Sequence, residues 1–220
     1  MPYRKVPLAE GNIYHVFTRS IAGYKIFNSD MDFKRMFTAI AFYTSMPSAG
    51  RISDFFRGSR KQRKEFPLQN YPLNKKIRLI AYCIMPTHIH LLLHQLGEES
   101  ISRYINLVLK SYSKYFNLKH KRLGPLWESR FKNVIVESDE QLIHLTRYIH
   151  LNPVTAYLVD RPEDWRHSSY QEYLKVIEDG KGICDYSGYV AMGSNSYRNF
   201  TNDQIDYQRK LQDIKKLILE

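Results

Sequence analysis

The chain has 220 residues, enough for one large domain or for one domain with an extension. Its 33 Lys and Arg against 22 Asp and Glu give a net charge of +11, which favours a polyanionic partner, most often nucleic acid. Cys83 and Cys184 lie far apart without close partners, which excludes zinc knuckles and disulfide scaffolds. No apolar stretch or signal-peptide core suggests membrane contact, so we expect a cytoplasmic protein.

The first half of the chain predicts a strand, a helix and a loop. Residues 13–19 are rich in aromatic and β-branched types, which is typical of a strand. Residues 28–30 supply capping side chains for a helix that extends to about Thr44. Residues 51–76 show no hydrophobic periodicity and predict a long basic loop. Loops of this length within a compact domain are usually functional or disordered.

Regular periodicity returns after this loop. Residues 77–85 and 88–94 predict two strands joined by a tight turn at Pro86, and therefore a hairpin. A helix follows over residues 98–117, and a further strand over 132–137. The next helix opens on a capping box at residues 138–141.

The last expected elements are helical. The helix that opens at Ser138 should stop near Asn152, because Pro153 disfavours the helical conformation in the residue before it. An amphipathic helix is expected over residues 164–177, and a charged helix over 203–219.

The element order predicts an α+β fold with a ferredoxin-like (RRM-like) βαββαβ antiparallel sheet and an appended helix. The first and third strands should be central, and the two main helices should cover one face. Residues 1–177 would form this domain and residues 178–220 a C-terminal extension. Side chains alternate along a strand, so Ile89 and Leu91 should face the helices while His88 and His90 face the open side.

Tyr148 and Asn152 lie four residues apart and therefore share one face of the appended helix, which is placed to cover the open side of the sheet. His88, His90 and the Asn152 oxygen would offer three ligands to Mg²⁺ or Mn²⁺, and Tyr148 could attack a phosphate as a covalent nucleophile. Each residue also has an ordinary interpretation: an isolated His-x-His triplet need not bind a metal, Tyr148 could be a surface residue, and Asn152 could simply end the helix.

Three segments carry a resemblance to a known family: Ala81-Tyr-Cys-Ile-Met-Pro-Thr-His-Ile-His-Leu-Leu-Leu93, Gly124-Pro-Leu-Trp-Glu-Ser-Arg-Phe-Lys132 and Arg147-Tyr-Ile-His-Leu-Asn-Pro-Val154. They resemble the single-tyrosine HUH transposases, specifically the IS200-like and REP-associated tyrosine transposases, over about residues 10–174. Thr87 and Ser20 depart from the residues common in that family.

The resemblance implies an enzyme that nicks and joins single-stranded DNA with the help of a divalent metal. Its metal ligands would be His88, His90 and Asn152. Its nucleophile would be Tyr148, which would form a 5′-phosphotyrosine link and release a 3′-hydroxyl. The expected partner is single-stranded DNA with a hairpin, and family members act as monomers or homodimers.

DNA binding requires positive charge and flat rings. The residues expected to bind nucleic acid are Arg19, Arg60, Lys61, Arg63, Lys64, Lys110, Lys114, Trp127, Arg130 and Lys132. Tyr112 and Tyr115 are competing nucleophiles that the fold should place on the far side of the sheet. His15 is either a partner of the histidine pair or an ordinary buried histidine.

Two other function classes stay open from sequence alone. A domesticated relative could bind hairpin DNA or RNA without transposing. A zinc hydrolase would require a further His, Cys or carboxylate ligand close to the histidine pair.

Overall fold

The computed structural model describes residues 7–45, 52, 76–177 and 182–219. Residues 57–64 of the predicted basic loop, with Arg60, Lys61, Arg63 and Lys64, lie outside this described part. None of the helices within these ranges is long and apolar enough to cross a membrane.

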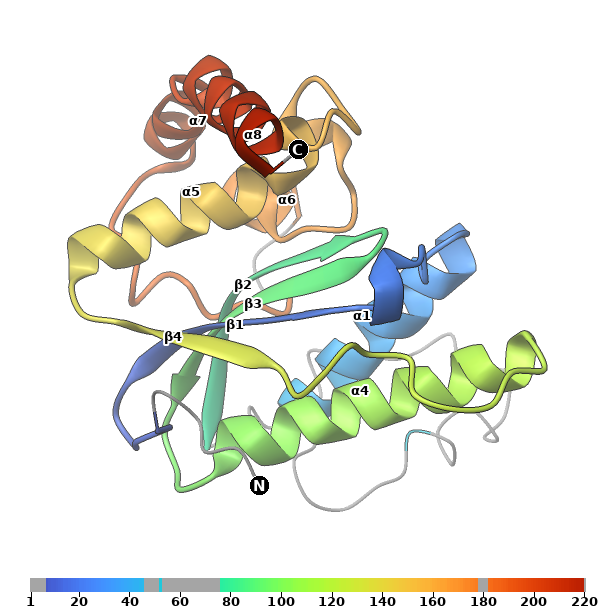
Figure 1. Cartoon of the computed structure of the whole chain (residues 1–220). Coiled ribbons are helices and arrows are strands. Elements are labelled where there is room, and N and C mark those ends of the chain that lie inside the picture. Colours follow the sequence, from blue (N-terminus) through green and yellow to red (C-terminus); the bar gives the residue numbers. More distant parts are fainter. Residues whose placement is uncertain (1–6, 46–51, 53–75, 178–181, 220) are drawn as a thin grey trace.

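The centre of the fold is a four-stranded antiparallel sheet in the order β2-β3-β1-β4 (Figure 1). Its strands are β1 (Ile13–Arg19), β2 (Ile77–Met85), β3 (His88–Gln95) and β4 (Lys132–Val136). The predicted fold class is confirmed, with the first and third strands in the middle. The hairpin of β2 and β3 is also confirmed, because Met85 pairs directly with His88 across the turn.

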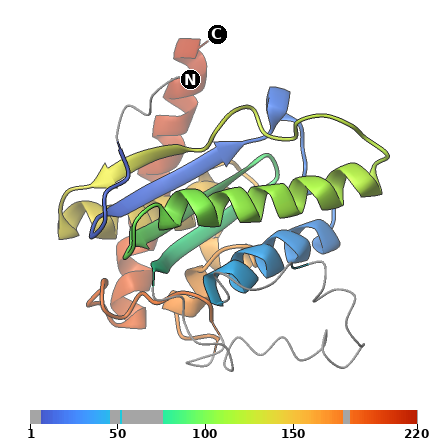
Figure 2. The same ribbon diagram turned by 90° about the horizontal axis from the view of Figure 1, so that it is seen from below.

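Two helices cover one face of the sheet, α1 (Asp30–Ser45) and α4 (Ser100–Lys119) (Figure 2). Their apolar stripes bury Met36, Ile40, Ile105 and Val108 against the sheet. The odd-numbered side chains of β3 belong to this core, as the alternation predicts. The short 3₁₀ turn η1 (Ile21–Gly23) leads from β1 towards α1.

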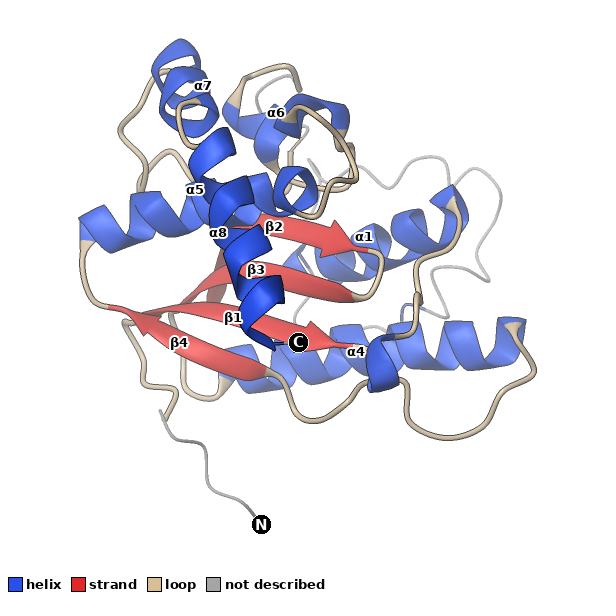
Figure 3. Ribbon diagram, turned by 45° about the horizontal axis from the view of Figure 1, so that its top comes forward, coloured by secondary structure: helices blue, strands red, loops and turns tan. Residues whose placement is uncertain are grey.

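The opposite face is covered by α5 (Asp139–Thr155), with α7 (Ser194–Asn202) and α8 (Ile205–Leu219) packed on α5 (Figure 3). Ser138 caps α5 by accepting a hydrogen bond from the backbone N–H of Gln141 at 3.1 Å. Leu92, from β3, and Ile149, from α5, meet in a second core on this side. The even-numbered side chains of β3 therefore lie between the sheet and the helices that follow it.

The predicted end of α5 at Asn152 is wrong, because the helix continues through Pro153 to Thr155. Proline removes one backbone donor, but only a short piece of helix follows it, and Ala156 still donates to the carbonyl of Asn152 at 3.0 Å. Leu151 and Val154 are fully buried on either side. We infer that their packing outweighs the lost hydrogen bond.

The prediction of a helix over residues 164–177 is also wrong. Only the 3₁₀ turn η3 (Pro162–Asp164) and the short α6 (Tyr170–Tyr173) form. The residues between them bond to β2 instead: Ile84 N–H donates to the His167 carbonyl at 2.8 Å, and Ser169 N–H to the Tyr82 carbonyl at 3.0 Å. These backbone groups therefore pair with the edge strand β2 instead of forming a helix, and they cover an edge that would otherwise be exposed.

Candidate active site

The histidine pair lies on a central strand and faces α5. His88 is opposite Arg19 in the register of β1 and β3, and His90 is opposite Phe17. The two imidazole rings have centroids 5.0 Å apart and stand almost perpendicular, at 84°. His90 is 6 % exposed, so the pair lies at the bottom of a depression in the sheet face.

Each of these rings has one nitrogen engaged. Nδ1 of His88 lies 2.9 Å from the Thr87 hydroxyl, and Nδ1 of His90 lies 2.9 Å from Nε2 of His15. Nε2 of both rings makes no hydrogen bond to any described residue. An orienting partner on one nitrogen and an open second nitrogen is the usual arrangement of a histidine that ligates a metal.

Both rings are neutral at physiological pH. Burial, together with the charge of Arg19, lowers the pKa of His88 to about 4. Burial is also the main cause that holds the pKa of His90 well below its usual value. Neutral imidazoles keep the lone pair that a metal requires.

The helix α5 brings Tyr148 and Asn152 over the histidines. The Tyr148 ring centroid is 5.8 Å from that of His90, and the tyrosine is 40 % exposed. The Asn152 amide nitrogen donates to the Tyr148 carbonyl at 2.8 Å, so its Oδ1 stays available as an acceptor. A tyrosine side chain that solvent can reach therefore lies beside three neutral donor atoms.

The Tyr148 phenol is protonated at neutral pH. Burial raises its pKa above the usual value, while a hydrogen bond from Asn152 and the positive charge of Arg19 act in the opposite direction. The positive charge of Arg19 therefore acts on both histidines and on this tyrosine.

These groups line one cavity of about 400 Å³. Its lining contains seven of the residues predicted from sequence, namely Arg19, His88, His90, Arg130, Lys132, Tyr148 and Asn152. The segment that carries Arg130 is fixed to the end of β1. Glu128 N–H donates to the Arg19 carbonyl at 3.0 Å, and Trp127 forms a bridge with Ser20.

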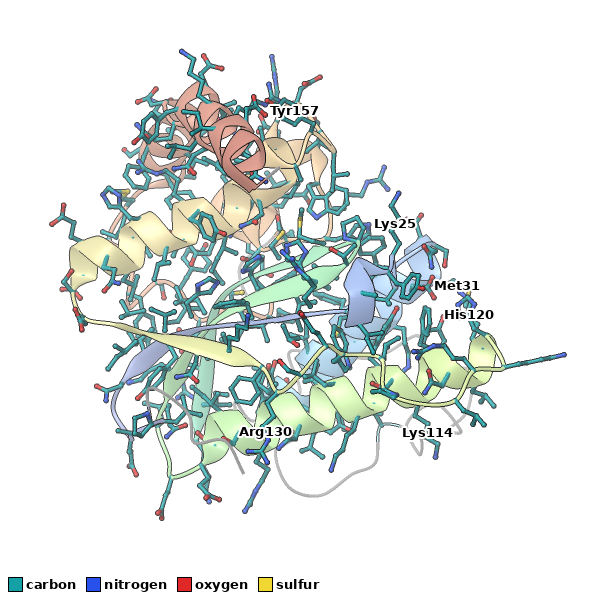
Figure 4. All side chains as sticks on the ribbon, in the orientation of Figure 1. Lys25, Met31, Lys114, His120, Arg130 and Tyr157 are labelled. Carbon is teal, nitrogen blue, oxygen red and sulfur yellow. The ribbon has the colours of Figure 1, made fainter. Side chains whose placement is uncertain are left out.

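The other predicted residues lie elsewhere. Trp127 and Lys110 line a second groove, beside α4, and Lys114 is exposed further along that helix (Figure 4). Tyr112 and Tyr115 lie on the far side of the sheet, as expected. Tyr112 is fully buried and donates to the carbonyl of Ile26.

Several residues of the cavity were not predicted. Thr155 and Ala156 follow Asn152 by about one helical turn, so the helical period would have included them had α5 not been ended at Pro153. Glu128 and Ser129 lie between Trp127 and Arg130, and neither a carboxylate nor a small hydroxyl is a signal for DNA binding. Gln212 comes from α8, whose docking position no local pattern shows.

Comparisons with known proteins bear on the family and the fold of this chain. A family described as "Transposase IS200 like" matches residues 51–152. A protein of Haemophilus influenzae described as "Putative REP-associated tyrosine transposase" is 30% identical over 132 residues, which cover 55% of this chain and 70% of that protein. A solved structure, of a REP-associated tyrosine transposase bound to a REP hairpin, matches with a TM-score of 0.52 and 15% identity, covering 84% of this chain and 93% of its own.

Proposed function

Because this chain belongs to the family of IS200-like and REP-associated tyrosine transposases, we propose that it cuts and joins single-stranded DNA through a covalent bond to Tyr148. The observation that carries the proposal is the meeting of Tyr148, Asn152 and the two histidines in one cavity. Among the residues that the structure describes, no other tyrosine lines that cavity.

The donor set fits a hard divalent cation. Nε2 of His88, Nε2 of His90 and Oδ1 of Asn152 are neutral donors that would hold Mg²⁺ or Mn²⁺. Within the described residues, no three His, Cys, Asp or Glu side chains converge to hold a metal, which disfavours a zinc hydrolase. When bound, the cation would polarise the scissile phosphate and stabilise charge on the leaving oxygen.

In the proposed reaction the Tyr148 oxygen attacks the phosphorus. The new bond joins the phenol oxygen to the 5′-phosphate, and the bond from phosphorus to the 3′ oxygen breaks. The phenol proton passes to water, and the 3′ oxygen takes a proton from water. Joining is the reverse, with a 3′-hydroxyl attacking the phosphotyrosine.

The basic residues of the cavity would hold the DNA backbone. Arg19 is central, because its charge already acts on the phenol and on both imidazoles. Lys132 and Arg130 extend the positive charge along the wall next to β4. The structural relative was solved with a hairpin, and we propose hairpin-bearing single-stranded DNA as the substrate.

The test is a covalent-adduct assay with Mn²⁺ or Mg²⁺ and hairpin DNA that carries single-stranded flanks. Wild type should give a protein–DNA adduct that survives denaturation and disappears with a chelator. Tyr148→Phe should give none, whereas Tyr24→Phe, a matched change at a 66 % exposed tyrosine, should react like wild type. Hairpin binding without any adduct would instead identify a domesticated binding protein.

A further inference from the structure

The larger of the two cavities described above does not contain Tyr148. It is an open groove of about 730 Å³ between one face of α4 and the segment that leads into β4. The α4 side chains that form its floor recur at helical spacing: Ser102, Asn106, Leu109, Lys110 and Ser113. Its size is within the range of about 300–1,000 Å³ that is typical of small-molecule pockets.

One wall of the groove is the indole of Trp127. This side chain is only half-buried, and its ring packs on Tyr112 in the core, with the centroids 6.2 Å apart. Its Nε1–H donates to the Ser113 hydroxyl at 3.0 Å, which fixes the orientation of the ring. A flat aromatic surface held in one orientation is a platform on which a nucleobase can stack.

The remaining lining suits a nucleotide. Asn106 and the Ser102 hydroxyl provide donors and acceptors for the edge of a base, and Lys110 and Arg130 provide positive charge. From Ser100 to Lys119, α4 has no acidic residue and four basic ones, Arg103, Lys110, Lys114 and Lys119. Glu99, which precedes α4, is the single carboxylate among the described residues that line the groove.

The groove adjoins the active-site cavity. Ser129 and Arg130 line both spaces. Arg130 lies beside the first half of α4, at the edge of the sheet (Figure 4). A strand whose phosphate lies next to Tyr148 can therefore pass over the 128–131 segment and enter the groove without leaving the protein surface.

We propose that this groove binds an unpaired nucleotide of the DNA strand that is cut at Tyr148, with the base stacked on Trp127 and the backbone beside Lys110 and Arg130. The inference rests on the proposed function for its substrate. It adds a base-binding site on the helix side of the sheet, away from the metal donors.

The test is a binding titration with Tyr148→Phe protein, in which the DNA stays intact. A hairpin oligonucleotide receives one abasic nucleotide at a time on either side of the expected cut. One position, or two adjacent ones, should weaken binding about tenfold, as loss of one stacked base does. In protein that carries both Tyr148→Phe and Trp127→Ala, binding of the intact DNA should be weakened by the same factor. The abasic nucleotide should then have no further effect on affinity.

Trp127→Ala also removes a side chain that packs on the core, so a second measurement leaves this residue in place. The chain has two tryptophans, and Trp165→Phe leaves Trp127 as the single tryptophan, whose emission is read with excitation that spares tyrosine. Intact DNA should quench its emission, and DNA that is abasic at the sensitive position should not. Lys110→Ala should weaken binding more than Arg103→Ala, a charge loss on the same helix outside the groove.

A flat abasic scan, or an abasic effect that persists unchanged in Trp127→Ala, would overturn the proposal, as would quenching that does not depend on the base. These outcomes are separate from a failure of the catalytic proposal. If the Tyr148 adduct forms while the scan is flat, only the groove assignment is lost. If one position is sensitive while no adduct ever forms, the groove stands as a DNA-binding site and the chemistry is lost.

Discussion

The hydrogen bond between His15 and His90 gives a direct test of the metal site. A metal-bound His90 must keep a proton on Nδ1, and Nε2 of His15 then accepts it at 2.9 Å. His15→Phe removes this acceptor but keeps a flat ring, which suits the stacked geometry of the two imidazoles, with centroids 5.1 Å apart and planes 18° apart. The change therefore removes one interaction and preserves most of the packing.

The size of the effect follows from burial. His90 is 6 % exposed, so an Nδ1–H without a partner costs about 1–3 kcal/mol. Without metal, the ring can avoid this cost by moving its proton to the other nitrogen. The penalty therefore falls on the metal-bound state, and affinity should decrease about 5- to 150-fold. Losses of about 10–100-fold are typical when the partner of a metal-bound histidine is removed.

The assay is Mn²⁺ binding, by calorimetry or by electron paramagnetic resonance, in a Tyr148→Phe background. His94→Phe is the matched control, because His94 lies on the same strand but bonds to Tyr189, away from the site. Unchanged Mn²⁺ affinity in His15→Phe, or an equal loss in the control, would refute the role given to His15.

Three further predictions concern Asn152 of α5, the capping residue Ser138 of the same helix, and Glu172 of α6. Asn152→Ala should weaken Mn²⁺ binding at least tenfold, measured by calorimetry. Asn152→Asp should bind Mn²⁺ more tightly than wild type, because it supplies a charged oxygen. Equal Mn²⁺ affinities of Asn152→Ala and wild type would show that Asn152 is not a ligand. Ser138→Ala removes the cap of α5 and should cost about 1 kcal/mol in thermal unfolding without abolishing the adduct; an unchanged melting temperature would contradict the capping role. Burial raises the pKa of Glu172 from 4.5 to about 7, so the folded state holds a proton that the unfolded state releases. The free energy of unfolding of wild type, relative to that of Glu172→Gln, should therefore decrease by about 3 kcal/mol as pH rises from 4.5 to 7. Denaturant titrations at several pH values measure this difference, and a difference that does not change with pH would contradict the prediction.

The sheet and its two main helices could be predicted because local patterns decide them. Side-chain alternation decides which side of β3 faces α1 and α4, and β1 and β2 have the bounds that were expected from their aromatic and β-branched residues. Tyr148 and Asn152 could be paired because the helical period places residues four apart on one face.

The errors occur where tertiary contacts outweigh local signals. Pro153 predicts a helix end, but buried packing on both sides extends α5 by about one turn and brings Thr155 into the cavity. The 164–177 segment has a helical pattern, yet the free edge of β2 binds its backbone. The contribution of Gln212 depends on where α8 docks, which no local pattern reports.

The division at residue 177 into a domain and an extension stays a prediction, as does the choice between monomer and homodimer. The helices after that boundary pack on α5, and their aromatic residue Tyr197 is fully buried in the second core. Its hydroxyl lies 2.7 Å from Nδ1 of His150, on the side of α5 away from the cavity. The extension thus helps to fix the helix that carries the proposed nucleophile.

The central claim is that Tyr148 becomes covalently attached to DNA, and peptide mass spectrometry of the isolated adduct tests it most directly. After nuclease and protease digestion, the peptide that contains Tyr148 should carry a nucleotide through its 5′-phosphate, and the released strand should end in a 3′-hydroxyl. A nucleotide on any other residue, or cleavage of bound DNA with Tyr148 unmodified throughout the reaction, would contradict the account.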